Sequence, residues 1–249
     1  MNQADHNHSD ASLAELHHHN HADPHWRASA LSDIILGGQD GLVNVLGVIL
    51  GIAAATGDAR IVLVAGLAAT FAESVSMAAV AYTSTMVDAD VYESERKREY
   101  RHIHEVPNLE REEIRSIYSE KGFKGEMLDR IVETITANKD VWVAVMMAEE
   151  HQLSAINRGT ALRSGIVVGL AAIFGSLIPL IPFLFLPVSL AIAGSILISA
   201  LVLFFVGALK ARMTVGHPGK SGLEMAAIGT VSALVGYAVG LILKVPAVP

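Results

Sequence analysis

A run of 26 residues, 61–86, is almost entirely apolar or small and contains a single charged residue, Glu73 (IVLVAGLAATFAESVSMAAVAYTSTM). A stretch of this length is long enough to cross a bilayer as an α-helix. At about 1.5 Å per residue, Glu73 lies roughly 18–20 Å from either end of the run, near the bilayer midplane. An ionised carboxylate at that depth costs several kcal/mol unless it is paired, hydrated or protonated. Glu73 is therefore a candidate functional residue.

The residues that follow this run are polar and charged (VDADVYESERKREYRHIHE), and neither proline nor glycine occurs in them before Pro107. Uninterrupted helix-forming sequence of this kind predicts one long helix that leaves the membrane and continues into solvent. Met77 follows Glu73 by four residues, so that a thioether and a carboxylate are expected on the same helical face.

The remaining sequence contains four further apolar stretches, at residues 34–56, 160–181, 187–209 and 223–243. Together with a hydrophobic content of 52% and a charged content of only 17%, they predict an all-α polytopic membrane protein with five transmembrane helices. The expected organisation is a disordered His-rich tail at residues 1–30, transmembrane helices 1 and 2 at 31–87, a helical metal-binding insert at 88–158, and transmembrane helices 3–5 at 159–249.

The first apolar stretch contains several glycines and two polar residues, Asp40 and Asn44. Asp40 is expected about two helical turns inside the membrane. An alternative is that Asp40 caps a helix that begins only at Gly41, although that helix would be short for a bilayer. Within the insert, Pro107 is expected to end the first helix and Asn108 to cap the second. A third helix is expected at residues 126–137 and a fourth from Asp140 onwards.

The distribution of basic residues predicts the orientation. With five spans and a cytoplasmic N-terminus, sixteen of the 18 Lys and Arg residues lie on the cytoplasmic side, and only Arg60 and Lys244 lie outside. The insert is therefore expected in the cytoplasm. The first 27 residues lack the apolar core of a signal peptide, so the first span is expected to direct insertion, and a prokaryotic inner membrane is favoured. No nucleic acid partner is expected for a chain with a formal net charge of −7.

Histidine is concentrated near the N-terminus. Such a tail can gather divalent metal loosely, but a solvated tail without a specific role is an equally simple interpretation. Cysteine is absent, so any metal must be held by carboxylate, imidazole, thioether or backbone oxygen. The tail histidines are His6, His8, His17, His18, His19, His21 and His25.

Two groups of residues are candidate metal ligands. In the membrane, the second span descends towards the cytoplasm, which places Met77 at a depth close to that of Asp40 and Glu73 one turn deeper. These side chains could share one cation on its way across the membrane. The candidate transport residues are Asp40, Asn44, Glu73 and Met77.

The second group lies in the insert, where acidic residues recur at i,i+3 and i,i+4 spacing. Helical proteins bind Fe²⁺ or Mn²⁺ with carboxylates arranged in this way on facing helices, and a methionine thioether favours transition metals over Mg²⁺ and Ca²⁺. Taken singly, each glutamate could belong to a solvated face and each methionine to a packed core. The candidate ligands are Glu95, Glu99, His102, Glu105, Glu110, Glu113, Met146, Met147, Glu149 and Glu150.

Five segments together resemble the vacuolar iron transporter family over residues 33–243: QDGLVNVLGVILGIAAA, AGLAATFAESVSMAAVAYTS, NLEREEIRSIYSEKGF, WVAVMMAEEHQL and the Gly-rich last helix. The resemblance implies a five-helix homodimer in the lipid bilayer that exchanges cytoplasmic Fe²⁺, sometimes Mn²⁺, for protons. It also implies a cytoplasmic metal-binding domain that feeds a pore at the dimer interface. It places Asp40, Glu73 and Met77 in the pore, and it assigns the soluble metal site to Glu99, Glu110, Glu113, Met146 and Glu150.

The sequence departs from the family pattern at two places. Val80-Ala81-Tyr82 stands where the family has Gly-Glu-Tyr, and His102 stands where a glutamate is expected. These departures leave a Mn²⁺-preferring or broad-range exporter as an alternative to an iron exporter.

The expected function is secondary transport of Fe²⁺ or Mn²⁺ as substrate, without an enzymatic reaction and without an organic cofactor. A membrane-anchored di-iron ferroxidase is one alternative, but helical di-iron sites use two Glu-x-x-His motifs. This sequence has one, from Glu99 to His102, and residue 148 is alanine, so that His151 does not complete a second. A metal sensor is the other alternative, and it leaves Asp40 and Glu73 unexplained.

Overall fold

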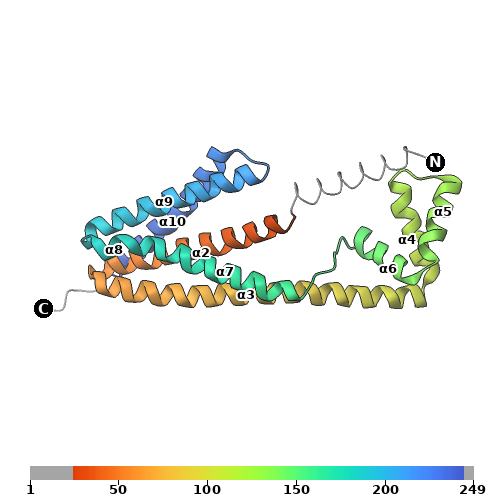
Figure 1. The fold of residues 1–249 in the computed structure, drawn as a ribbon, viewed down its shortest axis with the longest axis horizontal. Coiled ribbons are helices and arrows are strands. Elements are labelled where there is room, and N and C mark those ends of the chain that lie inside the picture. The colour runs from red at the N-terminus through yellow and green to blue at the C-terminus, as the bar shows by residue number, and fades with distance from the viewer. Residues whose placement is uncertain (1–24, 244–249) are drawn as a thin grey trace, which may run out of the picture. The chain divides into compact units, whose positions relative to one another are not determined.

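The computed structural model describes residues 25–243, and all the secondary structure in this range is helical (Figure 1). The disordered tail predicted for residues 1–30 lies mostly outside the described residues. The elements are α2 (His25–Thr56), α3 (Ala59–Glu105), α4 (Pro107–Glu120), α5 (Gly125–Thr136), α6 (Lys139–Glu149), α7 (Gly159–Leu177), the 3₁₀ turn η1 (Ile178–Leu180), α8 (Ile181–Phe185), α9 (Val188–Met213) and α10 (Pro218–Ile242).

Five helical segments are long and apolar enough to cross a membrane, which confirms the five predicted spans. They are Ala30–Thr56, Ala59–Glu105, Gly159–Phe185, Val188–Met213 and Pro218–Ile242. The third span extends beyond its predicted end at residue 181 and reaches Phe185, because the proline-containing segment after α7 continues as η1 and α8. Each proline there occupies one of the first two positions of its helical segment, where a missing N–H costs no hydrogen bond.

The two helices that carry the predicted membrane carboxylates are both continuous. The 47-residue helix α3 runs unbroken to Glu105, as predicted from the absence of proline and glycine. Helix α2 is also unbroken from His25 to Thr56, so the alternative in which Asp40 caps a helix starting at Gly41 is wrong. Tertiary packing explains why the glycines do not interrupt α2. A Cβ atom at Gly41 would lie 2.5 Å from the carbonyl oxygen of Ala172, so glycine allows α7 to approach closely.

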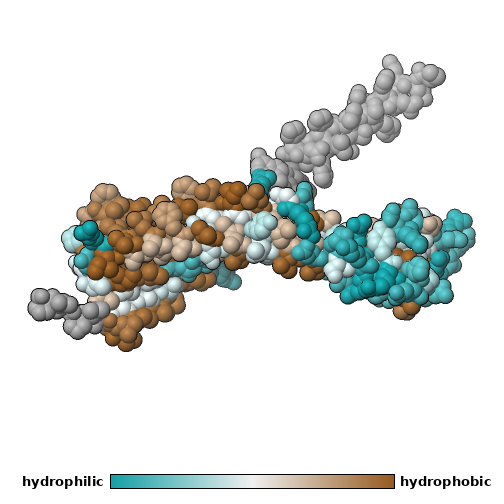
Figure 2. Space-filling view, turned by 90° about the horizontal axis from the view of Figure 1, so that it is seen from below, coloured by the Kyte–Doolittle hydropathy of each residue, from teal (hydrophilic) through white to brown (hydrophobic). Residues whose placement is uncertain are grey.

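The chain divides into two compact units, and the first contains the residues up to Val80 and those from Ser164 onwards. Its core is formed by α2, the start of α3, α8, α9 and α10, with fully buried Leu46, Ile49 and Leu50 at the centre. Helix α10 packs along α2 so closely that the backbone of Gly236 meets that of Gly47. The surface of this unit is largely apolar (Figure 2), as expected for helices that face lipid.

The second unit, Ala81–Arg163, contains the end of α3 and helices α4, α5 and α6. Its hydrophobic core includes Ile103, Ile114 and Trp142, and its surface is mostly hydrophilic (Figure 2). The residue range of this unit includes the insert predicted at residues 88–158. The predicted cap at Asn108 is wrong, because α4 already begins at Pro107 and Val106 occupies the N-cap position. The proline fits the first helical position, where its fixed φ favours helix and its missing N–H is not needed.

Candidate metal sites

In the first unit, three of the four predicted transport residues form one hydrogen-bonded cluster. The Asn44 side chain on α2 donates to Asp40 Oδ2 at 3.1 Å and to Glu73 Oε1 on α3 at 3.1 Å. Asp40 and Asn44 share a face of α2 because they are four residues apart. One amide therefore holds two carboxylates from different helices close together, and the cluster offers several oxygen atoms to a cation.

The cluster lies at the side of the unit and not in its core. Asn44 is exposed, and Asp40, Glu73 and Met77 are half-buried in the single chain. Met77 lies on α3 one turn after Glu73, and its role as a ligand stays a prediction. Polar groups at this depth are costly to leave against lipid.

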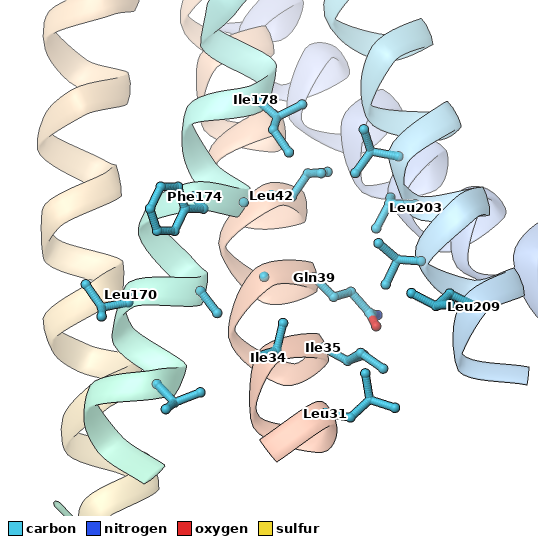
Figure 3. Close-up of a pocket in the computed structure, with 16 residues that line it drawn as sticks. Leu31, Ile34, Ile35, Gln39, Leu42, Leu170, Phe174, Ile178, Leu203 and Leu209 are labelled. Carbon is cyan, nitrogen blue, oxygen red and sulfur yellow. The ribbon is translucent and has the colours of Figure 1, made fainter. Parts of the chain in front are cut away.

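A separate pocket of about 480 Å³ lies between α2, α7 and α9 (Figure 3). Gln39 points into it, and the other labelled side chains, such as Phe174 and Leu203, are apolar. Its lining contains no carboxylate, imidazole or thioether, so this pocket offers none of the ligands that transition metals favour.

In the insert, two glutamates are buried almost completely. Glu99 near the end of α3 is 2% exposed, and Glu110 in the first turn of α4 is 3% exposed. One carboxylate oxygen of each, Oε2, is buried without a hydrogen-bond partner among residues 25–243. His102 lies between them, with its Nδ1 atom 3.3 Å from Glu110 Oε1 and 3.9 Å from Glu99 Oε1. Buried carboxylates that lack partners are expected where a ligand is to be bound.

His151 joins this group from the end of α6. Its Nε2 atom lies 3.0 Å from Glu99 Oε1. The chain turns here in a defined way: the backbone N–H groups of His151 and Leu153 donate to the carbonyls of Met146 and Met147, and Gln152 adopts a φ of 54°, in the left-handed region. This turn at the helix end positions the imidazole against α3.

A cavity of about 420 Å³ lies at the centre of the group. Six of the predicted insert ligands line it, together with His151 and the cation Arg98. The six are Glu99, His102, Glu105, Glu110, Glu113 and Glu150.

The other four predicted insert ligands lie elsewhere. Met146 and Met147 are fully buried in the hydrophobic core of the insert, Glu149 forms an ion pair with Lys121 at 2.7 Å, and Glu95 pairs with Arg98. None of the four is among the residues that line the cavity.

Burial, together with the neighbouring carboxylates, raises the pKa of Glu110 and of Glu150. Burial, and then the neighbouring charges of Glu113 and Glu99, raise the pKa of Glu110 from its ordinary value of 4.5 to about 7. The pKa of Glu150 is also raised, first by burial and then by Glu113, against an opposing effect of His151. A cation in the cavity would relieve the same repulsion, so protons and metal ions are expected to compete for this site.

His151 is not among the metal ligands predicted from the sequence. The prediction relied on helical spacing. His151 lies just beyond the end of α6 and contacts Glu99, which is 52 residues earlier in the chain. The Glu149-Glu150-His151 run at the end of a helical segment was the available signal.

The chain is similar to known proteins over most of its length. The VIT family model matches residues 31–241. The chain is 33% identical over 219 residues to vacuolar iron transporter 2 of Oryza sativa subsp. japonica, covering 87% of this chain and 89% of the relative. It is 30% identical over 231 residues to vacuolar iron transporter 1 of the same organism, covering 92% and 91%. It is 29% identical over 236 residues to the vacuolar iron transporter of Toxoplasma gondii, covering 90% and 78%. The chain belongs to the VIT family.

Proposed function

We propose that this protein transports a divalent transition metal, Fe²⁺ or Mn²⁺, out of the cytoplasm in exchange for protons. The relatives are named as iron transporters, which supports metal transport as the activity. The observation that carries the proposal is the Asn44 amide shared by Asp40 and Glu73 within two membrane-spanning helices. Such a group of polar residues inside a bilayer is costly, and it is characteristic of ion pathways.

The proposed coupling uses the carboxylates of this cluster. When no metal is bound, protonation removes the charge of Glu73 and lowers the cost of keeping it in the membrane. When M²⁺ arrives, the carboxylates ionise, bind it with the Met77 thioether and release protons. Exchange of one cation for protons then follows from the competition between them for the same oxygens.

The proposed direction follows from the orientation. Sixteen of 18 basic residues lie on one side of the membrane when the N-terminus is cytoplasmic, so the insert and its carboxylates face the cytoplasm. In this position, the insert collects metal from the cytoplasm for export. The named relatives are eukaryotic and vacuolar, so they do not support the predicted prokaryotic inner membrane. The five spans support an integral, multi-pass membrane protein.

A homodimer is part of the proposal. Asn44 is exposed in the single chain although it lies well inside a span, and both of its carboxylate partners are only half-buried. A second copy placed against this face would remove the cluster from lipid and enclose the pathway.

The test is metal uptake into proteoliposomes of the purified protein under an imposed pH gradient. We expect Fe²⁺ flux that depends on the gradient and is accompanied by opposite proton movement. Asp40→Ala and Glu73→Gln should abolish the flux, and metal binding by the insert should be preserved in both. Flux that persists unchanged in both variants would reject the proposed pathway.

The same experiment distinguishes transport from a ferroxidase. An oxidase would convert Fe²⁺ to Fe³⁺ without net uptake, and its activity would be unaffected by Asp40→Ala. We therefore expect no catalytic Fe²⁺ oxidation by the purified protein, and oxidation without flux would favour the enzyme.

A further inference from the structure

Two imidazoles approach the buried carboxylate of Glu99. His151 from the end of α6 lies 3.0 Å from Oε1, and His102, one turn along α3, lies 3.9 Å from the same oxygen. The side chains form two sets of potential metal ligands. Within each set, the ligand atoms all lie within 4.8 Å of one another. One set contains Glu99, Glu150 and His151, and the other contains Glu99, His102 and Glu110.

The spacing between His151 and Glu99 is suited to metal coordination. Two ligands that each lie about 2.1 Å from a metal ion and meet at a right angle are about 3.0 Å apart. The Nε2–Oε1 distance of 3.0 Å therefore fits two neighbouring ligands of one ion as well as a direct hydrogen bond.

The other contacts of the cavity favour an ion over a simple His–Glu pair. His151 and His102 both approach Oε1 of Glu99. The second oxygen, Oε2, is buried without a hydrogen-bond partner in the described part of the chain, as is Oε2 of Glu110. Five carboxylates and one cation, Arg98, line the cavity. Burying the two unpaired oxygens of Glu99 and Glu110 beside other carboxylates costs free energy that a divalent cation would offset.

We propose that His151 is a metal ligand of the insert and that, with His102, it makes the site selective for ions that favour nitrogen. Imidazole suits Fe²⁺, Co²⁺, Ni²⁺ and Zn²⁺, whereas Mn²⁺ lies at the weak end of the affinity order and is well served by oxygen alone. The role of this selectivity in transport rests on the proposed function, because the insert would then determine which metal reaches the membrane.

The test is an equilibrium titration of the full-length protein in detergent with Co²⁺, Zn²⁺ and Mn²⁺ separately. Co²⁺ binding is followed by its visible absorption, which reports nitrogen ligands, and the other two by calorimetry. We expect His151→Gln to weaken Co²⁺ and Zn²⁺ binding about 10-fold or more and to change the Co²⁺ spectrum, with a smaller effect on Mn²⁺. His104→Gln is the control, because His104 is an exposed histidine of α3, the helix that carries Glu99, and it does not line the cavity.

A second variant separates coordination from a structural role of the imidazole. His151→Glu replaces nitrogen with oxygen, so a ligand position predicts retained Mn²⁺ binding and a smaller preference for Co²⁺ over Mn²⁺ than in the unmodified protein. A purely structural histidine predicts equal weakening for all three metals, because the new charge repels Glu99. That result, or an unchanged Co²⁺ affinity and spectrum in His151→Gln, would overturn the inference. Binding in detergent does not depend on flux, so a failure of transport would leave this test unaffected.

Discussion

Asn44 and Glu73 are joined across two membrane-spanning helices, with the Asn44 amide nitrogen 3.1 Å from Glu73 Oε1. The same nitrogen lies 3.1 Å from Asp40 Oδ2, so that one neutral donor separates two acidic groups. A cation that binds between the carboxylates takes over the role of this amide. In the proposed pathway, Asn44 would hold the two carboxylates together when no ion is bound.

The first prediction concerns this amide. Asn44→Ala should reduce metal flux about 10- to 100-fold, because a hydrogen bond to a charged group contributes about 1.5–3 kcal/mol and its loss leaves the carboxylates unpositioned. Gln39→Ala is the control, since it removes an amide from the same helix that points into the apolar pocket (Figure 3). Proteoliposome uptake measures both variants. Equal loss of flux in the two would argue against a specific role for Asn44.

The second prediction concerns Met77. Met77→Leu keeps an apolar side chain of similar size and removes the sulfur. Fe²⁺ flux should therefore fall more than Mn²⁺ flux, because a thioether favours the softer ion. Met86→Leu, at a half-buried position further along α3, should have little effect on either metal. The ratio of the two fluxes in competition is the measurement. An unchanged ratio would remove Met77 from the set of metal ligands.

The third prediction concerns pH. The pKa of Glu110 is raised to about 7 by burial and by neighbouring carboxylates, so below this pH the site binds a proton that metal must displace. Metal affinity of the insert should therefore rise with pH up to about 7 and level off above it, with up to about a tenfold change per unit on the acidic side. Glu110→Gln should bind more weakly at pH 8 and depend less on pH. Glu112→Gln, at an exposed position of α4, is expected to keep the pH profile of the unmodified protein.

The fourth prediction compares two adjacent glutamates at the end of α6. Glu150 lines the acidic cavity, whereas Glu149 forms an ion pair with Lys121 at 2.7 Å. Glu150→Gln should weaken metal binding by the insert about 10-fold or more, and Glu149→Gln should leave it within about threefold. Calorimetric titration with Mn²⁺ measures both. Similar losses in the two variants would mean that overall negative charge, and not ligation, controls affinity.

The fifth prediction concerns the close packing of α2 against α7. A Cβ at Gly41 would lie 2.5 Å from the carbonyl oxygen of Ala172, whereas a Cβ at Gly38 has its nearest neighbour, the carbonyl oxygen of Ala171, at an ordinary 3.7 Å. Gly41→Ala should therefore destabilise the protein by on the order of 1–3 kcal/mol, and Gly38→Ala should be neutral or slightly stabilising. Thermal unfolding in detergent compares the two. A lower melting temperature for Gly38→Ala than for Gly41→Ala would contradict the packing.

The sequence predicts the elements of this fold well where a single local signal decides the outcome. The absence of proline and glycine before Pro107 predicts the long helix α3, and the apolar stretches predict the five spans. The alternative in which a helix starts at Gly41 was wrong, because packing there overrides a local signal. The glycines of α2 look like interruptions in sequence, but Gly41 provides the close approach of α7.

The insert site was predicted in part for the same reason. Glu99, Glu110 and Glu150 follow from helical periodicity, and the structure brings them to one cavity. His151 could not be reached by periodicity, because it lies beyond the end of α6 and meets Glu99 only through the tertiary fold. The methionines were ambiguous in sequence, and Met146 and Met147 lie in the hydrophobic core of the insert.

The contact of α2 with α10 limits how this protein can move. The backbones of Gly47 and Gly51 meet those of Gly236 and Gly240 directly, without side chains between them. Because these helices are packed backbone to backbone, we expect the two to move together. Asp40 and Asn44 belong to this pair of helices, whereas Glu73 is carried by α3. A cycle that opens the cluster first to one side of the membrane and then to the other must therefore find its hinge between α3 and this pair.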